Sequence, residues 1–255
     1  MDLTGQVVAI TGGTSGIGRA TVDLLRARGA EVALIARNPA KASRVAGETG
    51  ADPIIADICD EDALVRAFDG IYERYSRLDG LVANAGVNVP EGLVHQLATA
   101  VWEEVMDTDL RGTFLTVREA LARMVPGGRG GSIVCVSSVM AHGGIPAGGT
   151  AYTAAKGGVE AFVRSVAVDY AVHGIRCNAL APGATETPMM WVTTSPADVE
   201  RTRDILGREI PLGRLAQPID IAHAIVWLLS PEAGYVTGTT LLVDGGARAR
   251  LILSV

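Results

Sequence analysis

The stretch Val7-Val8-Ala9-Ile10-Thr11-Gly12-Gly13-Thr14-Ser15-Gly16-Ile17-Gly18 decides the fold that this sequence predicts. Four apolar residues enter a glycine-rich turn, after which apolar residues recur at helical spacing, so the turn joins a buried strand to a helix. Glycines let the backbone approach a pyrophosphate, and a helix start offers unpaired N–H groups and a positive dipole end. A turn of this kind is often only a tight connection, but its place between strand and helix predicts dinucleotide binding by Gly12, Thr14, Ser15, Gly16, Ile17 and Gly18.

Outward from this turn, apolar segments of strand length alternate with helical patterns. The later strands are expected at residues 31–36, 53–56, 78–83, 133–137, 175–180 and 238–243. This alternation predicts a single α/β domain over residues 1–255, with a doubly wound parallel sheet of about seven strands and helices on both faces. A chain of 255 residues with 48% hydrophobic and 20% charged residues can bury a core of that size.

A second stretch, Tyr152-Thr153-Ala154-Ala155-Lys156, is predicted to open a long helix. Residues four apart share one helical face, so Tyr152 and Lys156 point into the same space, where the ammonium should lower the pKa of the phenol. Ser138 closes the strand before it and could present its hydroxyl there. The three groups together could polarise a carbonyl and protonate the alkoxide formed from it. Taken alone, they could equally be a surface tyrosine, a solvated lysine and a strand cap.

These two stretches and Ser138, followed by further motifs in a fixed order, closely resemble the short-chain dehydrogenase/reductase family over nearly the whole chain. The further motifs are Asn84-Ala85-Gly86, Pro182-Gly183 and Val243-Asp244-Gly245-Gly246. The chain looks like the 3-oxoacyl carrier-protein reductase-like members. The resemblance implies a Rossmann-type domain and reversible hydride transfer between a nicotinamide cofactor and a secondary alcohol/ketone pair. It implies that Tyr152 transfers the proton, Ser138 holds the carbonyl oxygen, and Lys156 lowers the tyrosine pKa and holds the ribose.

The resemblance also implies further cofactor contacts. Asp57 and Ile58 would lie along the adenine, and the exits of the fourth and sixth strands would face the nucleotide with Asn84, Ala85, Gly86, Pro182, Gly183, Thr185 and Thr187. Asp57 could equally cap the helix that begins near Asp60, and Thr187 could be an N-cap or loop threonine.

Arg37 bears on the choice of cofactor. It follows strand 31–36 directly, where an acidic residue would otherwise bind the ribose hydroxyls. A guanidinium is a planar fork that suits a phosphate. We therefore predict NADP(H) over NAD(H), with a solvated loop cation as the alternative for Arg37.

Asp109 is a departure from the family pattern. Residues 98–124 are predicted to be helical with an internal Gly112, and Asp109-Leu110-Arg111-Gly112 stands where the family normally has Asn-Leu-x-Gly. In relatives this residue sits at a helix irregularity, where its main-chain carbonyl holds a water that links the lysine to solvent. A main-chain role survives the substitution, so Asp109 is predicted as the fourth catalytic residue. Its carboxylate should favour charged Lys156 and oppose the Tyr152 phenolate, so the net tyrosine shift depends on distance.

Composition excludes several classes of partner. A net charge of −6 without a Lys/Arg cluster argues against nucleic acid or an anionic membrane and favours a small alcohol or ketone. No signal peptide or membrane span is apparent, and the three cysteines look like core thiols, which suits a reducing cytoplasm: Cys59, Cys135 and Cys177. The histidines lack ligand spacing, so no catalytic metal is predicted; they are His95, His142, His173 and His223.

Two C-terminal segments predict substrate closure and assembly. Residues 188–212 are a candidate substrate lid, because Met189, Met190 and Trp191 follow the cofactor segment directly, although core packing would also satisfy them. The apolar tail Leu251-Ile252-Leu253 and the family's habit of pairing predict a homotetramer, with a dimer as the alternative.

Two other functions remain possible at this point. A nucleotide-binding sensor or scaffold that has lost turnover is one, and the intact Ser138, Tyr152 and Lys156 count against it. A non-redox lyase such as a halohydrin dehalogenase is the other, and the intact glycine turn counts against that. The motifs do not choose among sugars, steroids, acyl thioesters and small cyclic alcohols as substrates.

Overall fold

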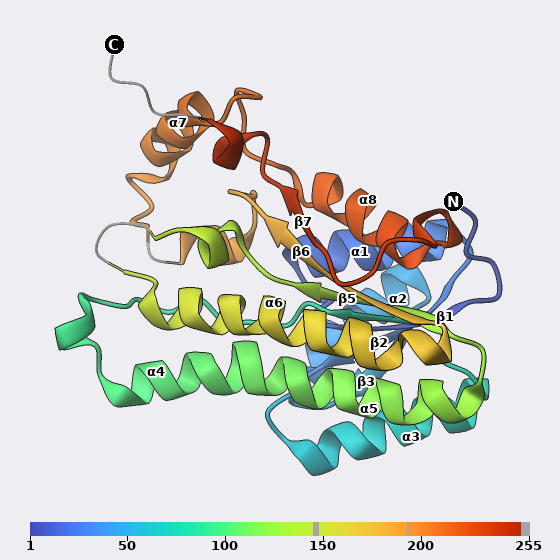
Figure 1. The fold of residues 1–255 in the computed structure, drawn as a ribbon. Coiled ribbons are helices and arrows are strands. Elements are labelled where there is room, and N and C mark those ends of the chain that lie inside the picture. The colour runs from blue at the N-terminus through green and yellow to red at the C-terminus, as the bar shows by residue number, and fades with distance from the viewer. Residues whose placement is uncertain (145–147, 193, 251–255) are drawn as a thin grey trace.

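Buried, largely apolar strands pair into one parallel sheet in the order β3-β2-β1-β4-β5-β6-β7 (Figure 1). The computed structural model describes residues 1–144, 148–192 and 194–250. The strands of this part of the chain are β1 (Val7–Thr11), β2 (Glu31–Ala36), β3 (Asp52–Ile55), β4 (Gly80–Ala83), β5 (Gly131–Val136), β6 (Ile175–Pro182) and β7 (Thr240–Val243). The central strands are buried on both faces, which explains their continuous apolar sequences, whereas the edge strands β3 and β7 are partly exposed.

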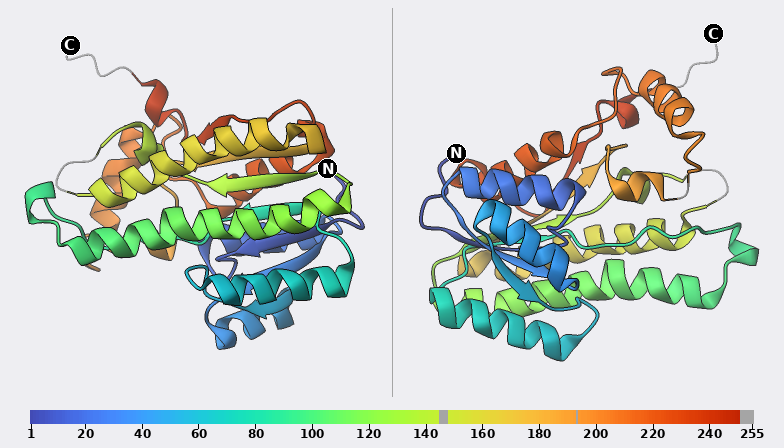
Figure 2. Two further views of the ribbon diagram at one scale, coloured as in Figure 1. Left: turned by 60° about the horizontal axis from the view of Figure 1, so that its bottom comes forward. Right: turned by 180° about the vertical axis from the view of Figure 1, so that it is seen from behind.

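Helices cover both faces of the sheet, and each face has its own hydrophobic core (Figure 2). One face carries α1 (Gly16–Ala27), α2 (Pro39–Thr49) and α8 (Pro218–Leu229); the other carries α3 (Glu61–Tyr75), α5 (Gly112–Gly127) and α6 (Thr150–Tyr170). Helix α4 (Thr99–Val105) continues into α5 through a π-helical segment, Met106–Arg111. Helix α7 (Val199–Glu209) lies beyond the carboxyl ends of the strands (Figure 1).

The strand order reverses at β1, and this places the functional site. β1 pairs with β2 on one side and with β4 on the other, so that Ala9 lies opposite both Ala33 and Leu81. In open α/β sheets the crevice beyond the carboxyl ends at such a switch point is where ligands bind. The glycine turn that follows β1 therefore opens into this crevice.

The predicted fold is confirmed, with differences at several element ends. The last strand begins at Thr240 because Gly238 has a φ of 74°, outside the β region. Helix α6 begins at Thr150, two residues before the predicted start, and α5 runs to Gly127, past the predicted end.

The cysteines differ from one another in burial. Cys135 and Cys177 are free buried thiols, as predicted, but Cys59 is only half-buried, since it lies on the surface between β3 and α3. The tail Leu251-Ile252-Leu253, on which the assembly prediction depends, lies outside the described residues.

Candidate active site

Glycines shape the turn between β1 and α1 so that the helix start faces the crevice. Gly12 and Gly16 have φ angles of 69° and 54°, which other residues rarely adopt, and an added Cβ on Gly18 would overlap the carbonyl oxygen of Gly12. Ser15 is the N-cap of α1, yet its side chain caps no N–H group, and the first helical turn, which holds Ile17, carries no acidic residue. Uncapped N–H groups at a positive dipole end fit the pyrophosphate of a dinucleotide.

Asn84 fastens the exit of β4 to this turn. Its side-chain amide donates to the main-chain oxygens of Thr11 and Gly12, each at 3.2 Å. The backbone N–H groups of Asn84 and Ala85 both donate to Thr11 Oγ1 at 3.1 Å. The sheet is therefore locked at the switch point, next to the turn that fits the pyrophosphate.

The end of β5 and the start of α6 bring Ser138, Tyr152 and Lys156 together. Ser138 is buried two residues after β5, and its Oγ accepts the N–H of Met140 at 3.2 Å. Tyr152 and Lys156 lie one turn apart on α6, with Lys156 Nζ 5.4 Å from the centre of the tyrosine ring. Lys156 Nζ also donates to the carbonyl oxygen of Val136 at 3.1 Å, which ties the ammonium to the end of β5.

Asp109 supplies a buried counter-charge to the lysine. Its side chain is fully buried in the π-helical segment, and its Oδ1 lies 3.3 Å from Lys156 Nζ while accepting the N–H of Val87 at 3.2 Å. Oδ2 is buried and has no hydrogen-bond partner among the described residues. An added Cβ on Gly86 would overlap Oδ1, so only glycine leaves space here. The main-chain oxygen of Asp109 accepts the hydroxyl of Thr113 at 2.8 Å.

Burial and the nearest opposite charge shift the pKa values of Tyr152, Lys156 and Asp109 in opposite directions. The pKa of Tyr152 is raised, because burial outweighs the lowering by Lys156; Asp109 raises this pKa further and the Ser138 hydroxyl lowers it. The ammonium therefore lowers the pKa of the phenol, as predicted, but desolvation by burial outweighs this effect and the net shift is upward. Burial lowers the pKa of Lys156, but Asp109 and then Tyr152 raise it above its ordinary value. Burial also raises the pKa of Asp109, against the lowering by Lys156.

Glu91 caps the start of α6, the helix that carries Tyr152 and Lys156, and sequence analysis missed it. Its carboxylate accepts the N–H groups of Ala151 at 2.7 Å and Tyr152 at 3.1 Å, which caps the start of α6. The N-cap residue itself, Gly149, has no side chain that could do so. Glu91 lies 60 residues before Ala151 in the chain, so no local pattern could indicate this cap.

The residues predicted at the adenine lie after β3. Asp57 is not the cap of α3, because Asp60 holds that position and accepts the N–H of Ala63 at 2.9 Å. The carboxylate of Asp57 instead accepts the N–H of Cys59 at 3.0 Å. Ile58 is buried, and Arg37 is exposed directly after β2.

The residues predicted at the nicotinamide follow β6, which ends at Pro182. An added Cβ on Gly183 would come to 2.7 Å from Asp244 Cα, so glycine lets the segments after β6 and β7 touch. Thr185 Oγ1 donates to the Gly183 oxygen at 2.9 Å. Thr187 caps the short helix Pro188–Trp191, as its alternative interpretation held, and its side chain lies against Gly16 of the glycine turn.

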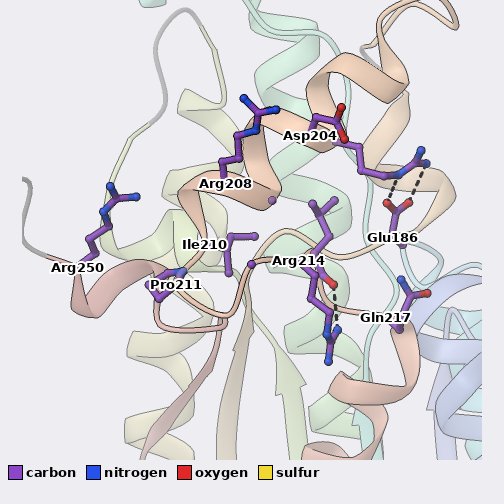
Figure 3. A pocket seen from close by; sticks show the side chains of 12 residues that line it. Glu186, Asp204, Arg208, Ile210, Pro211, Arg214, Gln217 and Arg250 are labelled. Carbon is purple, nitrogen blue, oxygen red and sulfur yellow. Dashed lines mark hydrogen bonds and ion pairs between the residues drawn. The ribbon is translucent and has the colours of Figure 1, made fainter.

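A pocket of about 890 Å³ lies between α7 and residues 210–217 (Figure 3). Glu186, Arg203 and Arg214 are among its lining residues, whereas Ser138, Tyr152 and Lys156 are not.

In the described ranges no helix is long and apolar enough to cross a bilayer. No cluster of three or more potential His, Cys, Asp or Glu metal ligands occurs there either.

Comparisons with known proteins identify the protein family to which the chain is similar. A family model described as enoyl-(acyl carrier protein) reductase matches residues 12–248. Cis-4-hydroxycyclohexanecarboxylate dehydrogenase from Sinomonas cyclohexanicum is 43% identical over 249 residues, covering 96% of this chain and 97% of that protein. The 3-oxoacyl-[acyl-carrier-protein] reductase from Thermotoga maritima is 36% identical over 253 residues, covering 96% and 99%. Among solved structures, levodione reductase has a TM-score of 0.90 and 33% identity, covering 98% of this chain and 100% of that one.

A parallel, doubly wound sheet with a glycine turn at its switch point is a dinucleotide-binding architecture. The chain belongs to the short-chain dehydrogenase/reductase family, oxidoreductases that act on alcohol and ketone substrates and bind nicotinamide cofactors. The resemblance drawn from the sequence motifs, including that to 3-oxoacyl carrier-protein reductases, is thereby confirmed.

Proposed function

We propose that this protein catalyses reversible hydride transfer between a nicotinamide cofactor and a secondary alcohol/ketone pair through Ser138, Tyr152 and Lys156. The observation that carries the proposal is the meeting of these three side chains at the carboxyl edge of the sheet, beside a turn that fits a pyrophosphate. When bound, the nicotinamide supplies or accepts the hydride.

In this proposal the chain's own residues handle the oxygen and its proton. The Ser138 hydroxyl donates a hydrogen bond to the carbonyl oxygen and orients it. The Tyr152 phenol gives its proton to that oxygen in reduction, and its phenolate takes the proton back in oxidation. Lys156 stays charged, stabilises the phenolate and holds the ribose. The Asp109 carboxylate, 3.3 Å from Lys156 Nζ, stabilises the charged form of Lys156. The main-chain carbonyl of Asp109 keeps the role that relatives give to this position, in which it holds a water that links the lysine to solvent.

We propose NADP(H) as the preferred cofactor, because Arg37 is exposed directly after β2 and no carboxylate takes its place there. The proposed contacts are the glycine turn for the pyrophosphate, Asp57 and Ile58 for the adenine, and the exits of β4 and β6 for the nicotinamide riboside. The contact of Thr187 with Gly16 supports this path, since it brings the segment after β6 against the pyrophosphate turn.

We propose a secondary alcohol on a six-membered ring, or the matching ketone, as the substrate. The support is the 43% identity to a dehydrogenase of a hydroxycyclohexane carboxylate over nearly the whole of both chains. The proposed lid, residues 188–212, offers exposed apolar side chains for such a ring in Met189 and Val192.

We further propose that the protein is a homotetramer located in the cytoplasm. The three free cysteines suit that compartment.

The test is a substrate panel in which turnover is monitored through the absorbance of the reduced nicotinamide. The panel contains cis-4-hydroxycyclohexanecarboxylate, cyclohexanol, cyclohexanone, a 3-oxoacyl thioester and a sugar, each with NADP(H) and NAD(H), together with a halohydrin assayed without nucleotide. Turnover of a ring alcohol that disappears in the Tyr152→Phe variant is expected. Tight nucleotide binding without turnover of any member would overturn the proposal in favour of the sensor, and halide release without nucleotide would favour the lyase.

A further inference from the structure

One carboxylate in the cofactor segment holds two separate parts of the lid. Glu186 lies between Thr185 and Thr187, and its Oε1 accepts Arg203 Nε from α7 at 2.5 Å (Figure 3). Its Oε2 accepts the indole Nε1 of Trp191, in the short helix Pro188–Trp191, at 3.1 Å. The side chain of Glu186 is only 18% exposed, whereas that of Arg203 is 35% exposed.

The two lid residues also contact each other. The guanidinium of Arg203 stands over the Trp191 ring, 5.3 Å from its centre, in the range of a cation–π interaction. Glu186, Trp191 and Arg203 therefore form a closed triangle of contacts. Arg203 has one more carboxylate partner, Glu200, which lies within α7 itself.

The anchor is fixed, whereas the helix that it holds is weakly packed. The backbone N–H of Glu186 donates to the oxygen of Ala216 at 2.9 Å, and Thr185 forms a β-bridge with Ala216. In contrast, α7 has no buried residue over Val199–Glu209. A helix with so few buried apolar contacts opens easily, so its polar attachment to Glu186 carries much of its placement.

We infer that Glu186 is a positioning residue that couples the lid to the nicotinamide segment and thereby sets the affinity for substrate. The inference rests on the proposed function, because it takes residues 188–212 as the lid and Thr185 and Thr187 as cofactor contacts. In this assignment Glu186 acts through Trp191 and Arg203 and not on the reacting atoms. Its carboxylate holds Trp191 and Arg203, which both belong to the proposed lid, so its loss should weaken substrate binding more than proton transfer.

The first test separates KM from kcat. Glu186→Gln keeps the shape but removes the charge, and the matched control Glu200→Gln removes the other carboxylate from the same guanidinium of Arg203. We expect Glu186→Gln to raise the substrate KM on the order of tenfold, which corresponds to the loss of one charge-assisted hydrogen bond. The kcat should stay within about twofold of the wild-type value. The control should match the wild type. An unchanged KM, or the same increase in the control, would overturn the inference.

The second test needs no turnover, so it distinguishes failure of the inference from failure of the proposed function. Hydrogen exchange of the full-length protein is followed in peptides that cover α7. We expect faster exchange in Glu186→Gln and in Arg203→Gln, but not in Glu200→Gln. The double variant of Glu186→Gln and Arg203→Gln should exchange more slowly than the sum of the two single effects predicts, because the two substitutions share the Glu186–Arg203 contact. Equal exchange in the wild type and both single variants would refute the coupling, even if the wild type turned over a ring alcohol.

Discussion

Replacing Asp109 by asparagine removes a buried charge from the active site and nearly preserves the side-chain shape. Asp109 raises the pKa of Tyr152, so its loss should lower that pKa. In the proposed mechanism alcohol oxidation requires the phenolate, so the acid limb of its pH–rate profile should move to lower pH. Asp109 also raises the pKa of Lys156. The ammonium should therefore be lost at lower pH in the variant, and the alkaline limb should move in the same direction.

The structure sets an upper bound on the distance between the two negative charges. Asp109 Oδ1 is 3.3 Å from Lys156 Nζ, which is 5.4 Å from the centre of the Tyr152 ring. Adding the reach of the phenolate oxygen, the two negative charges are at most about 12 Å apart, and at an effective dielectric constant of about 20 they repel by at least about 1.4 kcal/mol. This energy corresponds to about tenfold in rate on the acid limb.

The assay is kcat/KM for alcohol oxidation between pH 5 and pH 10, with saturating cofactor. Asp107→Asn is the matched control, because Asp107 is an exposed carboxylate in the same π-helical segment. An acid limb that stays in place or moves to higher pH in Asp109→Asn would refute the reasoning, as would an equal shift in the control. A rise in the maximal rate of about 10²-fold or more would mean that the natural enzyme is impaired, and would revive the sensor hypothesis.

Four further predictions concern the catalytic group, the cofactor and the assembly. Tyr152→Phe should lose about 10²-fold or more in kcat while nucleotide binding measured by calorimetry is retained, and a retained kcat would contradict the proposed mechanism. Lys156→Ala should lose both rate and cofactor affinity, and a variant that keeps both would place Lys156 outside the site. Arg37→Asp should reverse a preference for NADP(H) in kcat/KM; a wild type that prefers NAD(H) would make Arg37 a loop cation. Light scattering should show a tetramer at micromolar concentration, whereas a monomer would refute the assembly.

The fold was predictable because its signals are local. The apolar run before Gly12 and the helical pattern after Gly18 fix the strand, turn and helix without reference to the rest of the chain. Element ends were less predictable where a single backbone angle decides them. Gly238 has a φ of 74°, so the last strand can begin only after it, and no apolar pattern reveals this.

The chemistry of the site was predictable only as a set of residue types. Four-residue spacing placed Tyr152 beside Lys156, and the lysine lowers the pKa of the phenol as expected, but the spacing could not reveal the desolvation that makes the net shift upward. Glu91 and Glu186 escaped detection for a related reason. The partners that give them a role lie 60 residues away on α6 and 17 residues away on α7, so only the folded chain shows what they hold.

The carboxylate of Asp109 gives Lys156 an expected role in stability in addition to its proposed role in catalysis. A buried carboxylate is strongly unfavourable unless an opposite charge accompanies it, and Lys156 Nζ is the cation that lies beside Oδ1. Removal of one partner from a buried ion pair typically costs about 3–5 kcal/mol, because the other charge is left unpaired. The Lys156→Ala substitution should therefore lower the free energy of unfolding more in this protein than in one that carries asparagine at position 109. The double variant with Asp109→Asn should recover that stability without recovering activity, which separates the structural role of the lysine from its catalytic one.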